Sequence, residues 1–209
     1  ALIVGVSGQD GAYLAHYLLG RGYTVWGTSR DVEGTAFEGL KRLNILNNII
    51  LRNMPTNDYS AVWQVFNEAK PDEIYNLAGQ SSVGLSFAEP KNTIDSIFQA
   101  TLNQLEVIRK LCPAAKFYNA GSGEVYGNTN GKPSDENAMF SPASPYAAAK
   151  ASSALLVKLY RDCYDLFACT GILFNHDSEY RSNLNFIKKI TNYLNGNNFK
   201  KKLQLGNID

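Results

Sequence analysis

The sequence predicts an α/β fold, a doubly wound parallel sheet with helices on both faces, followed by the start of a smaller C-terminal region. Short apolar runs alternate with segments of helical periodicity along the first 174 residues, and this alternation is typical of a parallel sheet. The runs are almost continuously apolar, as expected for strands that are buried on both faces. The alternation weakens beyond Asn175, where a second region is expected to begin.

The expected strands are short runs of aliphatic, aromatic and β-branched residues bounded by turn-forming residues. They span residues 2–6, 24–28, 49–52, 73–77, 116–120 and 167–173, with a further short strand at 203–205. The expected helices carry apolar residues three or four positions apart. They span residues 12–19, 58–69, 94–111, 145–164 and 186–194. The stretch from 34 to 48 shows neither pattern.

Glycine and proline set the ends of several of these elements. Gly20 and Gly22 end the first helix, Pro71 precedes the fourth strand, Pro113 stops the long helix and Pro145 begins the next one. Glycine favours a helix C-terminus because it adopts left-handed backbone conformations without strain. Proline cannot continue a helix, but it suits the first helical position.

The composition excludes several classes of protein. A net charge of +1 argues against a nucleic-acid partner, and the lysine run at 200–202 is interpreted as solvated surface. No apolar run reaches the ~18–20 residues of a membrane helix, and no secretory signal opens the chain. Because the chain opens directly in a strand, we expect a few preceding residues, including the initiator methionine. Cys112, Cys163 and Cys169 fit no metal site, so we expect reduced, partly buried thiols, no metal and a cytoplasmic location.

A glycine-rich turn, GVSGQDG at residues 5–11, joins the first strand to the first helix. Its glycines permit a tight turn and let the backbone approach a pyrophosphate closely. The N–H groups at the helix N-terminus then attract the phosphate charge. We therefore expect a Rossmann-type dinucleotide site, with cofactor contacts at Gly5, Gly8, Gln9, Asp10 and Gly11. The G-x-x-G-x-x-G spacing resembles that of the short-chain dehydrogenase/reductase superfamily.

The end of the second strand favours NADP over NAD. Arg30 follows this strand directly, and no carboxylate occurs before Asp31. An acidic residue at this point binds the 2′-hydroxyl of NAD, whereas an arginine suits the 2′-phosphate of NADP. The alternative is that Arg30 is an ordinary surface arginine.

Tyr146 and Lys150 form the first half of a candidate catalytic set. Their i,i+4 spacing places both side chains on one face of the expected 145–164 helix. An ammonium group near a phenol favours the phenolate, which makes Tyr146 a usable general base. A tyrosine and a lysine at this spacing are by themselves weak evidence for a catalytic site. The glycine-rich turn strengthens that evidence because it predicts a dinucleotide cofactor in the same domain.

Ser122 and Glu124 form the second half, directly after the fifth strand. The carboxyl ends of parallel strands are where open α/β sheets bind ligands. Ser122 can donate a hydrogen bond to a substrate oxygen beside Tyr146. Glu124 adds a carboxyl group that simple hydride transfer does not require, although an exposed loop carboxylate is the simpler reading of this residue alone.

These features together resemble the extended short-chain dehydrogenases that modify nucleotide sugars, and most closely the GDP-mannose 4,6-dehydratase family. The similar stretches are residues 1–19, 70–87, 122–127 and 146–150. The most discriminating stretch is GILFNHD at 171–177, which is similar to the family's G-I-L-F-N-H-E. The resemblance covers nearly the whole chain, in order.

The resemblance implies a role for each matching residue. Ser122 takes the place of a catalytic threonine, while Glu124, Tyr146 and Lys150 are unchanged. The other implied contacts are Leu77 and Ala78 with the cofactor, and Ser86, Asn175 and Lys189 with the substrate. The implied reaction dehydrates GDP-mannose to GDP-4-keto-6-deoxymannose by internal hydride transfer through NADP, and the implied assembly is a homo-oligomer, a dimer or tetramer.

The chain also departs from the family pattern. Pro55 stands at a usually acidic position, Gly121 and Gly123 flank Ser122 in a loop with fewer hydroxyls, and Asp177 replaces a glutamate. The family's arginine-rich segment is not matched cleanly at 179–185. Another nucleotide-sugar enzyme of this fold therefore stays open, namely a UDP-glucuronate decarboxylase, a dTDP-glucose dehydratase or an epimerase, as does a non-catalytic NADP-binding regulator.

The expected domain organisation follows from the fold and the resemblance. Residues 1–174 are expected to form an NADP-binding domain that carries the catalytic set. Residues 175–209 are expected to begin a substrate-binding region, which the family continues further than this chain does.

Overall fold

The computed structural model describes residues 1–180, 186–196 and Leu203. The chain divides into two compact units, Ala1–Asn175 and His176–Asp209. The division falls directly after Asn175, next to the expected boundary after residue 174. In the second unit the described residues include one helix, α8 (Phe186–Asn195), where the sequence predicts a helix at 186–194.

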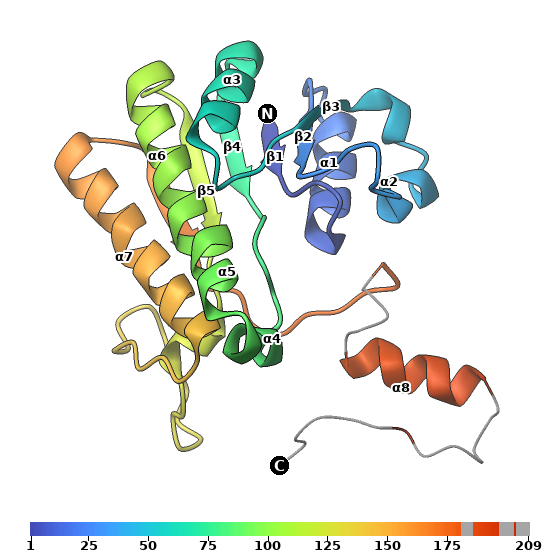
Figure 1. The fold of residues 1–209 in the computed structure, drawn as a ribbon, viewed down its shortest axis with the longest axis vertical. Coiled ribbons are helices and arrows are strands. Elements are labelled where there is room, and N and C mark those ends of the chain that lie inside the picture. Colours follow the sequence, from blue (N-terminus) through green and yellow to red (C-terminus); the bar gives the residue numbers. More distant parts are fainter. Residues whose placement is uncertain (181–185, 197–202, 204–209) are drawn as a thin grey trace. The chain divides into compact units, whose positions relative to one another are not determined.

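The first unit contains one sheet of six parallel strands in the order β3-β2-β1-β4-β5-β6 (Figure 1). The strands are β1 (Leu2–Val4), β2 (Trp26–Ser29), β3 (Ile50–Asn53), β4 (Glu73–Asn76), β5 (Lys116–Ala120) and β6 (Ala168–Gly171). Leu2 pairs with Trp26 of β2 on one side and with Ile74 of β4 on the other. The strand order therefore reverses around β1, and the crevice at such a reversal is where α/β sheets bind their ligands.

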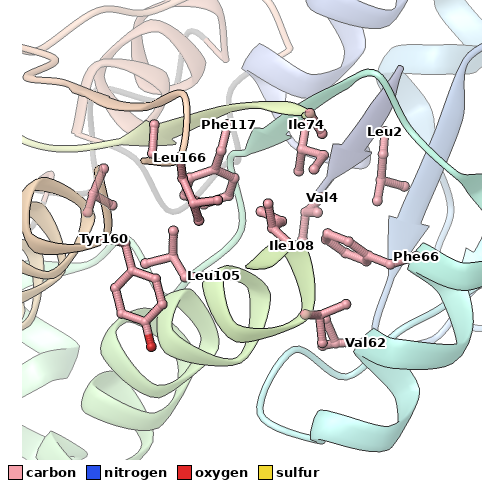
Figure 2. Packing of buried hydrophobic residues seen from close by; sticks show 14 of the residues in the cluster. Leu2, Val4, Val62, Phe66, Ile74, Leu105, Ile108, Phe117, Tyr160 and Leu166 are labelled. Carbon is pink, nitrogen blue, oxygen red and sulfur yellow. The ribbon is translucent and has the colours of Figure 1, made fainter. Parts of the chain in front are cut away.

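Three helices cover one face of the sheet (Figure 1): α3 (Tyr59–Ala69), α6 (Ala100–Leu111) and α7 (Pro145–Tyr164). Figure 2 shows Phe66 of α3, Leu105 of α6 and Tyr160 of α7 in one cluster with Ile74 and Phe117 from the strands. These side chains are almost completely removed from solvent. Burial of this apolar surface is the main favourable contribution to the stability of the unit.

The second face is covered over β1–β3 by α1 (Gln9–Gly20) and α2 (Glu38–Arg42). Ile3 lies in this second cluster with Leu18 and Leu40. Its neighbours Leu2 and Val4 lie in the first cluster. Strand β1 is therefore buried on both faces, which is why its sequence is continuously apolar.

The six strands predicted within residues 1–174 and most predicted helices are confirmed to within a few residues. The unassigned stretch contains α2 and the 3₁₀ turn η1 (Leu46–Asn48). Residues 204–209 lie outside the described residues, so the expected strand at 203–205 is not seen in full; Leu203 is in no helix or strand.

The long helix predicted at 94–111 differs from the structure in two ways. The helical path begins earlier, with α4 (Val83–Ala88) and α5 (Pro90–Ile94), and a π-helical segment η2 (Asp95–Gln99) precedes α6. Ser82 begins α4 by accepting a hydrogen bond from Leu85 N, a capping signal that the sequence reading overlooked. The π segment has no comparable local signal in the sequence.

The three cysteines are free thiols. The expectation that they are partly buried holds only for Cys112, since Cys163 and Cys169 are exposed. Among the described residues no helix is both long enough and apolar enough to span a membrane. The lysine run at 200–202 lies outside the described residues.

Candidate active site

The glycine-rich turn lies at the carboxyl end of β1, where two glycines are required by close contacts. Gly5 has a φ of +87°, and a Cβ at this position would lie 2.9 Å from the backbone of Ala78. A Cβ on Gly11 would lie 2.7 Å from Gly5 O and from Val6 Cα. These contacts show that the start of α1 packs directly against the glycine-rich turn. The glycine-rich turn packs against the segment after β4.

The start of α1 is open to an anion. Its N-cap residue is Gly8, which offers no side chain to the first N–H groups of the helix. Ser7 and Gly8 are exposed. The Gln9 amide donates a 3.1 Å hydrogen bond to Asp10 Oδ1 within the first turn. A helix N-terminus that begins at a glycine turn fits a pyrophosphate.

Two further predicted cofactor residues adjoin this turn. Leu77 N donates a 2.9 Å hydrogen bond to Val4 O, which continues the β1–β4 pairing beyond β4. Ala78 follows and lies against Gly5. The structure thus brings Gly5, Gly11 and Ala78 together at the carboxyl ends of β1 and β4.

At the end of β2, Arg30 and Asp31 are both exposed. The Asp31 carboxylate is turned back into its own loop, where Oδ1 accepts a 2.9 Å hydrogen bond from Gly34 N. Arg30 is the charged residue that directly follows β2, as predicted.

The predicted catalytic pair lies on the first two turns of α7. Pro145 occupies the start of the helix, and the Ser144 hydroxyl caps it by accepting a 3.1 Å hydrogen bond from Ala147 N. Tyr146 and Lys150 are both buried, each with 8% of its surface exposed. The Lys150 Nζ lies 5.9 Å from the centre of the Tyr146 ring. The predicted proximity of the two side chains is therefore present.

Lys150 is held under the end of β5. Its Nζ donates a 2.7 Å hydrogen bond to Ala120 O. Burial lowers the pKa of Lys150 from its ordinary 10.5 to about 8, because desolvation penalises the ammonium form. Even so, most of the population keeps the charge at neutral pH.

The loop after β5 presents Ser122 and Glu124. Ser122 begins the 3₁₀ turn η3 (Gly123–Tyr126), and its hydroxyl accepts a 3.3 Å hydrogen bond from Glu124 N. Ser122 is buried and Glu124 is exposed. Val125 and Tyr126 pack against Ala151 of α7. The turn that carries Glu124 is thereby anchored to the helix that carries the catalytic pair.

The glycines beside Ser122 have a steric explanation. A Cβ on Gly121 would lie 2.8 Å from Thr170 Cγ2, and a Cβ on Gly123 would lie 2.8 Å from the Phe174 ring. Gly123 N also donates a 2.7 Å hydrogen bond to Leu173 O. The glycines in this loop therefore leave room for Thr170 of β6 and for Phe174, which follows β6.

The π segment η2 packs against Tyr146, a contact that the sequence did not predict. Ile97 packs against Tyr146 and Ala149 in a small apolar cluster. The carbonyl of Ile97 accepts a 2.7 Å hydrogen bond from the Thr101 hydroxyl and a 3.4 Å bond from the Ser153 hydroxyl. A π-helical turn in a longer helix often marks a functional site, and here it lies against Tyr146, the predicted general base.

The predicted substrate residues are less well placed. Ser86 has no exposed surface, and its hydroxyl donates a 2.6 Å hydrogen bond to Val83 O. Contact with a sugar would therefore require α4 to move. Asn175 ends the first unit, whereas Lys189 lies in α8 of the second. The substrate roles of these three residues remain predictions.

Comparisons with known proteins add independent information. A family model described as GDP-mannose 4,6 dehydratase matches residues 2–209. The GDP-mannose 4,6-dehydratase of Vibrio cholerae is 40% identical over 218 residues, which cover 100% of this chain and 59% of the relative. The human GDP-mannose 4,6 dehydratase is 39% identical over 197 residues, which cover 90% of this chain and 53% of the relative. The chain thus spans somewhat more than half the length of these relatives.

Solved structures show the same fold. A dTDP-glucose 4,6-dehydratase from Streptomyces venezuelae, with NAD and TYD bound, superposes with a TM-score of 0.81 at 22% identity. That match covers 93% of this chain and 62% of the other. A UDP-glucose 4-epimerase from Thermus thermophilus, in complex with NAD, superposes with a TM-score of 0.68 at 27% identity. That match covers 79% of this chain and 51% of the epimerase chain.

Proposed function

Because the chain belongs to the GDP-mannose 4,6-dehydratase family, we propose that it acts in the conversion of GDP-mannose to GDP-4-keto-6-deoxymannose. The observation that carries this proposal is the position of Glu124. This exposed carboxyl group lies two residues after Ser122, on a turn that packs against the helix of Tyr146 and Lys150. Oxidation or reduction of a hydroxyl group would need only the other three residues, whereas elimination of water needs an additional proton acceptor and donor.

Each residue has a separate task in the proposed reaction. Tyr146, with its phenolate favoured by the Lys150 ammonium, removes the proton of the 4-hydroxyl group. Ser122 donates a hydrogen bond to the same oxygen and positions it. The resulting 4-ketone makes the C5 proton acidic. Glu124 then removes this proton and returns it to the 6-hydroxyl group, which leaves as water. C5 is protonated again when hydride is delivered to C6, and the release of the proton that Tyr146 took from the 4-hydroxyl group balances this step.

The cofactor of the proposed reaction is NADP. When bound, it would supply a hydride acceptor for C4 and a hydride donor for C6, so that none is consumed overall. The glycine cradle of Gly5, Gly8 and Gly11 supports binding of its pyrophosphate. Arg30 at the end of β2 supports the choice of NADP, because a guanidinium group binds a 2′-phosphate well.

The test is to incubate the full-length protein with GDP-mannose and a catalytic amount of NADP⁺, and to follow the sugar nucleotide by mass spectrometry. We expect a product lighter by one water, without steady accumulation of NADPH. Accumulation of NADPH would instead identify a dehydrogenase. If GDP-mannose does not react while NADP binds, the substrate assignment is wrong, and UDP- and dTDP-sugars are the next substrates to test.

The proposal extends to assembly and location. We propose a homo-oligomer, a dimer or tetramer, that works in the cytoplasm on a nucleotide-sugar substrate. Both statements rest on the family and on the composition of the chain. Size-exclusion chromatography with light scattering and cell fractionation would test them.

A further inference from the structure

The turn that follows β2 holds a carboxylate in an unusual position for a dinucleotide site. Asp31 lies immediately after Arg30, but its Oδ1 accepts a 2.9 Å hydrogen bond from Gly34 N. The Thr35 hydroxyl donates to Asp31 O. The Ser29 and Thr35 hydroxyls lie 3.0 Å apart and hold the two ends of the turn together. The Asp31 carboxylate is thereby folded back over its own turn.

Gly34 is the residue that leaves room for this arrangement. A Cβ on Gly34 would lie 2.2 Å from Asp31 Oδ2 and 3.0 Å from Asp31 Cγ. The three heavy atoms nearest to that position all belong to Asp31. Gly34 also has no positive φ, so an alanine would fit the backbone. The conflict is therefore with the end of one flexible side chain, and Asp31 would have to move.

The position of Asp31 matters because of what lies at the end of the second strand in this fold. A carboxylate presented there accepts a hydrogen bond from the ribose 2′-hydroxyl of NAD and repels the 2′-phosphate of NADP. Arg30 beside it has the opposite preference. Two adjacent residues thus favour different cofactors, and the turn decides which of them faces the ribose.

We propose that Gly34 determines the cofactor preference by allowing Asp31 to fold into its own turn, which leaves Arg30 to bind the 2′-phosphate of NADP. This inference rests on the proposed dinucleotide site and adds Asp31 and Gly34 as residues that determine its specificity. Neither residue takes part in the proposed dehydration.

The experiment measures the dissociation constants of NADP⁺ and NAD⁺ for the full-length protein by calorimetry. Gly34→Ala should displace the Asp31 carboxylate, weaken NADP⁺ binding and strengthen NAD⁺ binding. We expect the ratio of the two constants to change by about tenfold. The displaced Asp31 carboxylate would gain a hydrogen bond from the 2′-hydroxyl of NAD⁺ and would repel the 2′-phosphate of NADP⁺. In an Asp31→Asn background the same Gly34→Ala change should leave the ratio almost unchanged.

Two additional variants control for effects on folding. Gly20→Ala is the matched control, because a Cβ on Gly20 meets nothing within 4 Å, and it should leave the ratio unaltered. Asp31→Glu keeps Gly34 and the charge but is too long for the turn, so it should shift the ratio in the same direction as Gly34→Ala. This second route tests the inference even if Gly34→Ala destabilises the protein.

The inference is overturned if Gly34→Ala and Asp31→Glu both leave the ratio unchanged, or if Gly34→Ala acts equally in the Asp31→Asn background. It can be separated from the proposed function. A wild-type protein that prefers NAD⁺ would refute both NADP as the cofactor and this role of Gly34, whereas dehydration of GDP-mannose with no change of the ratio in Gly34→Ala would overturn the inference alone. A protein that binds neither dinucleotide would overturn both.

Discussion

Lys150 illustrates how burial of a single residue shapes the chemistry of this site. Its ammonium group is buried under β5 and has one hydrogen-bond acceptor, Ala120 O, among the described contacts. Desolvation lowers its pKa to about 8, so the charge that supports the Tyr146 phenolate is lost at a lower pH than for an exposed lysine. The alkaline limit of the reaction should follow this loss.

We expect the rate to decline as the pH rises through about 8, because neutral Lys150 no longer favours the Tyr146 phenolate. The measurement is the pH dependence of kcat for the wild type and for Lys150→Arg. A guanidinium group stays protonated above pH 12, so the variant should lose activity overall but retain its remaining rate at alkaline pH. An alkaline decline that is identical in both proteins would assign it to another group.

In the proposed reaction, Glu124 is the residue that separates dehydration from simple oxidation. Glu124→Gln keeps the size of the side chain but cannot accept the C5 proton, so dehydration should fall by at least 10²-fold. NADP binding should be unchanged, because the residue lies in η3 and not in the glycine cradle. The readouts are product mass and NADP affinity. Full dehydratase activity in this variant would remove Glu124 from the mechanism.

At the scale of secondary-structure elements, the cofactor site depends on how closely α1 approaches the turn after β1. Gly11 lies in the first turn of this helix and touches the backbone of Gly5 and Val6. Backbone atoms cannot move aside as a flexible side chain can. The close contact therefore fixes the position of the start of α1 relative to the turn.

Gly11→Ala should separate α1 from this turn. We expect the free energy of unfolding to fall by about 1–3 kcal/mol, as for other overpacked positions, and dinucleotide affinity to fall with it. Gly8→Ala is the control for stability, because its Cβ would lie at an ordinary 3.5 Å from Gly5 O. Chemical denaturation and dinucleotide titration measure both effects. Equal stability of the two variants would show that the close contact is not required.

The π segment η2 shows how one element can position another. It places Ile97 against Tyr146, and it exposes the Ile97 carbonyl to hydroxyl groups from α6 and α7. Helix α7 is thus fixed on two sides, by the π segment and by the η3 turn. Rigid support of this kind keeps catalytic groups in a productive geometry.

At the scale of the whole first unit, its core is continuous from β1 to β6 on the face covered by α3, α6 and α7 (Figure 2). An ion cluster at the outer edge of this core joins α6 to α7. Glu106 accepts hydrogen bonds from Arg109 and from Tyr160, which donates at 2.8 Å. The hydrogen bonds from Arg109, Tyr160 and Lys110 lower the pKa of Glu106 from its ordinary 4.5 to about 2.

This shift predicts how the stability of the unit depends on pH. A carboxyl group whose pKa is lower in the folded state stabilises the fold above its unfolded pKa, and this contribution is lost as the pH falls. Glu106→Gln should therefore lower the free energy of unfolding by about 1–2 kcal/mol at pH 7. The difference from the wild type should shrink between pH 4.5 and pH 2. Glu68 forms an exposed ion pair with Arg52, so Glu68→Gln should have little effect on the free energy of unfolding. A constant difference at every pH would contradict this assignment.

The sequence by itself determined the architecture and predicted which residues form the candidate catalytic set. Periodicity and turn residues are local signals, so the six strands and the helices α1, α3 and α7 could be read directly. The pair Tyr146 and Lys150 could be placed together because helical spacing alone brings residues i and i+4 to one face. Ser122 and Glu124 could be placed near them because parallel strands end at one edge of the sheet.

Only the tertiary structure decided the features that depend on contacts between distant segments. It shows that Phe174 and Thr170 require glycines at 123 and 121, and that a π segment supports Tyr146. It also shows that Asp31 folds back over Gly34. The physical reason is that periodicity reports which face of an element is buried, whereas close packing and side-chain direction depend on neighbours that the local sequence does not specify.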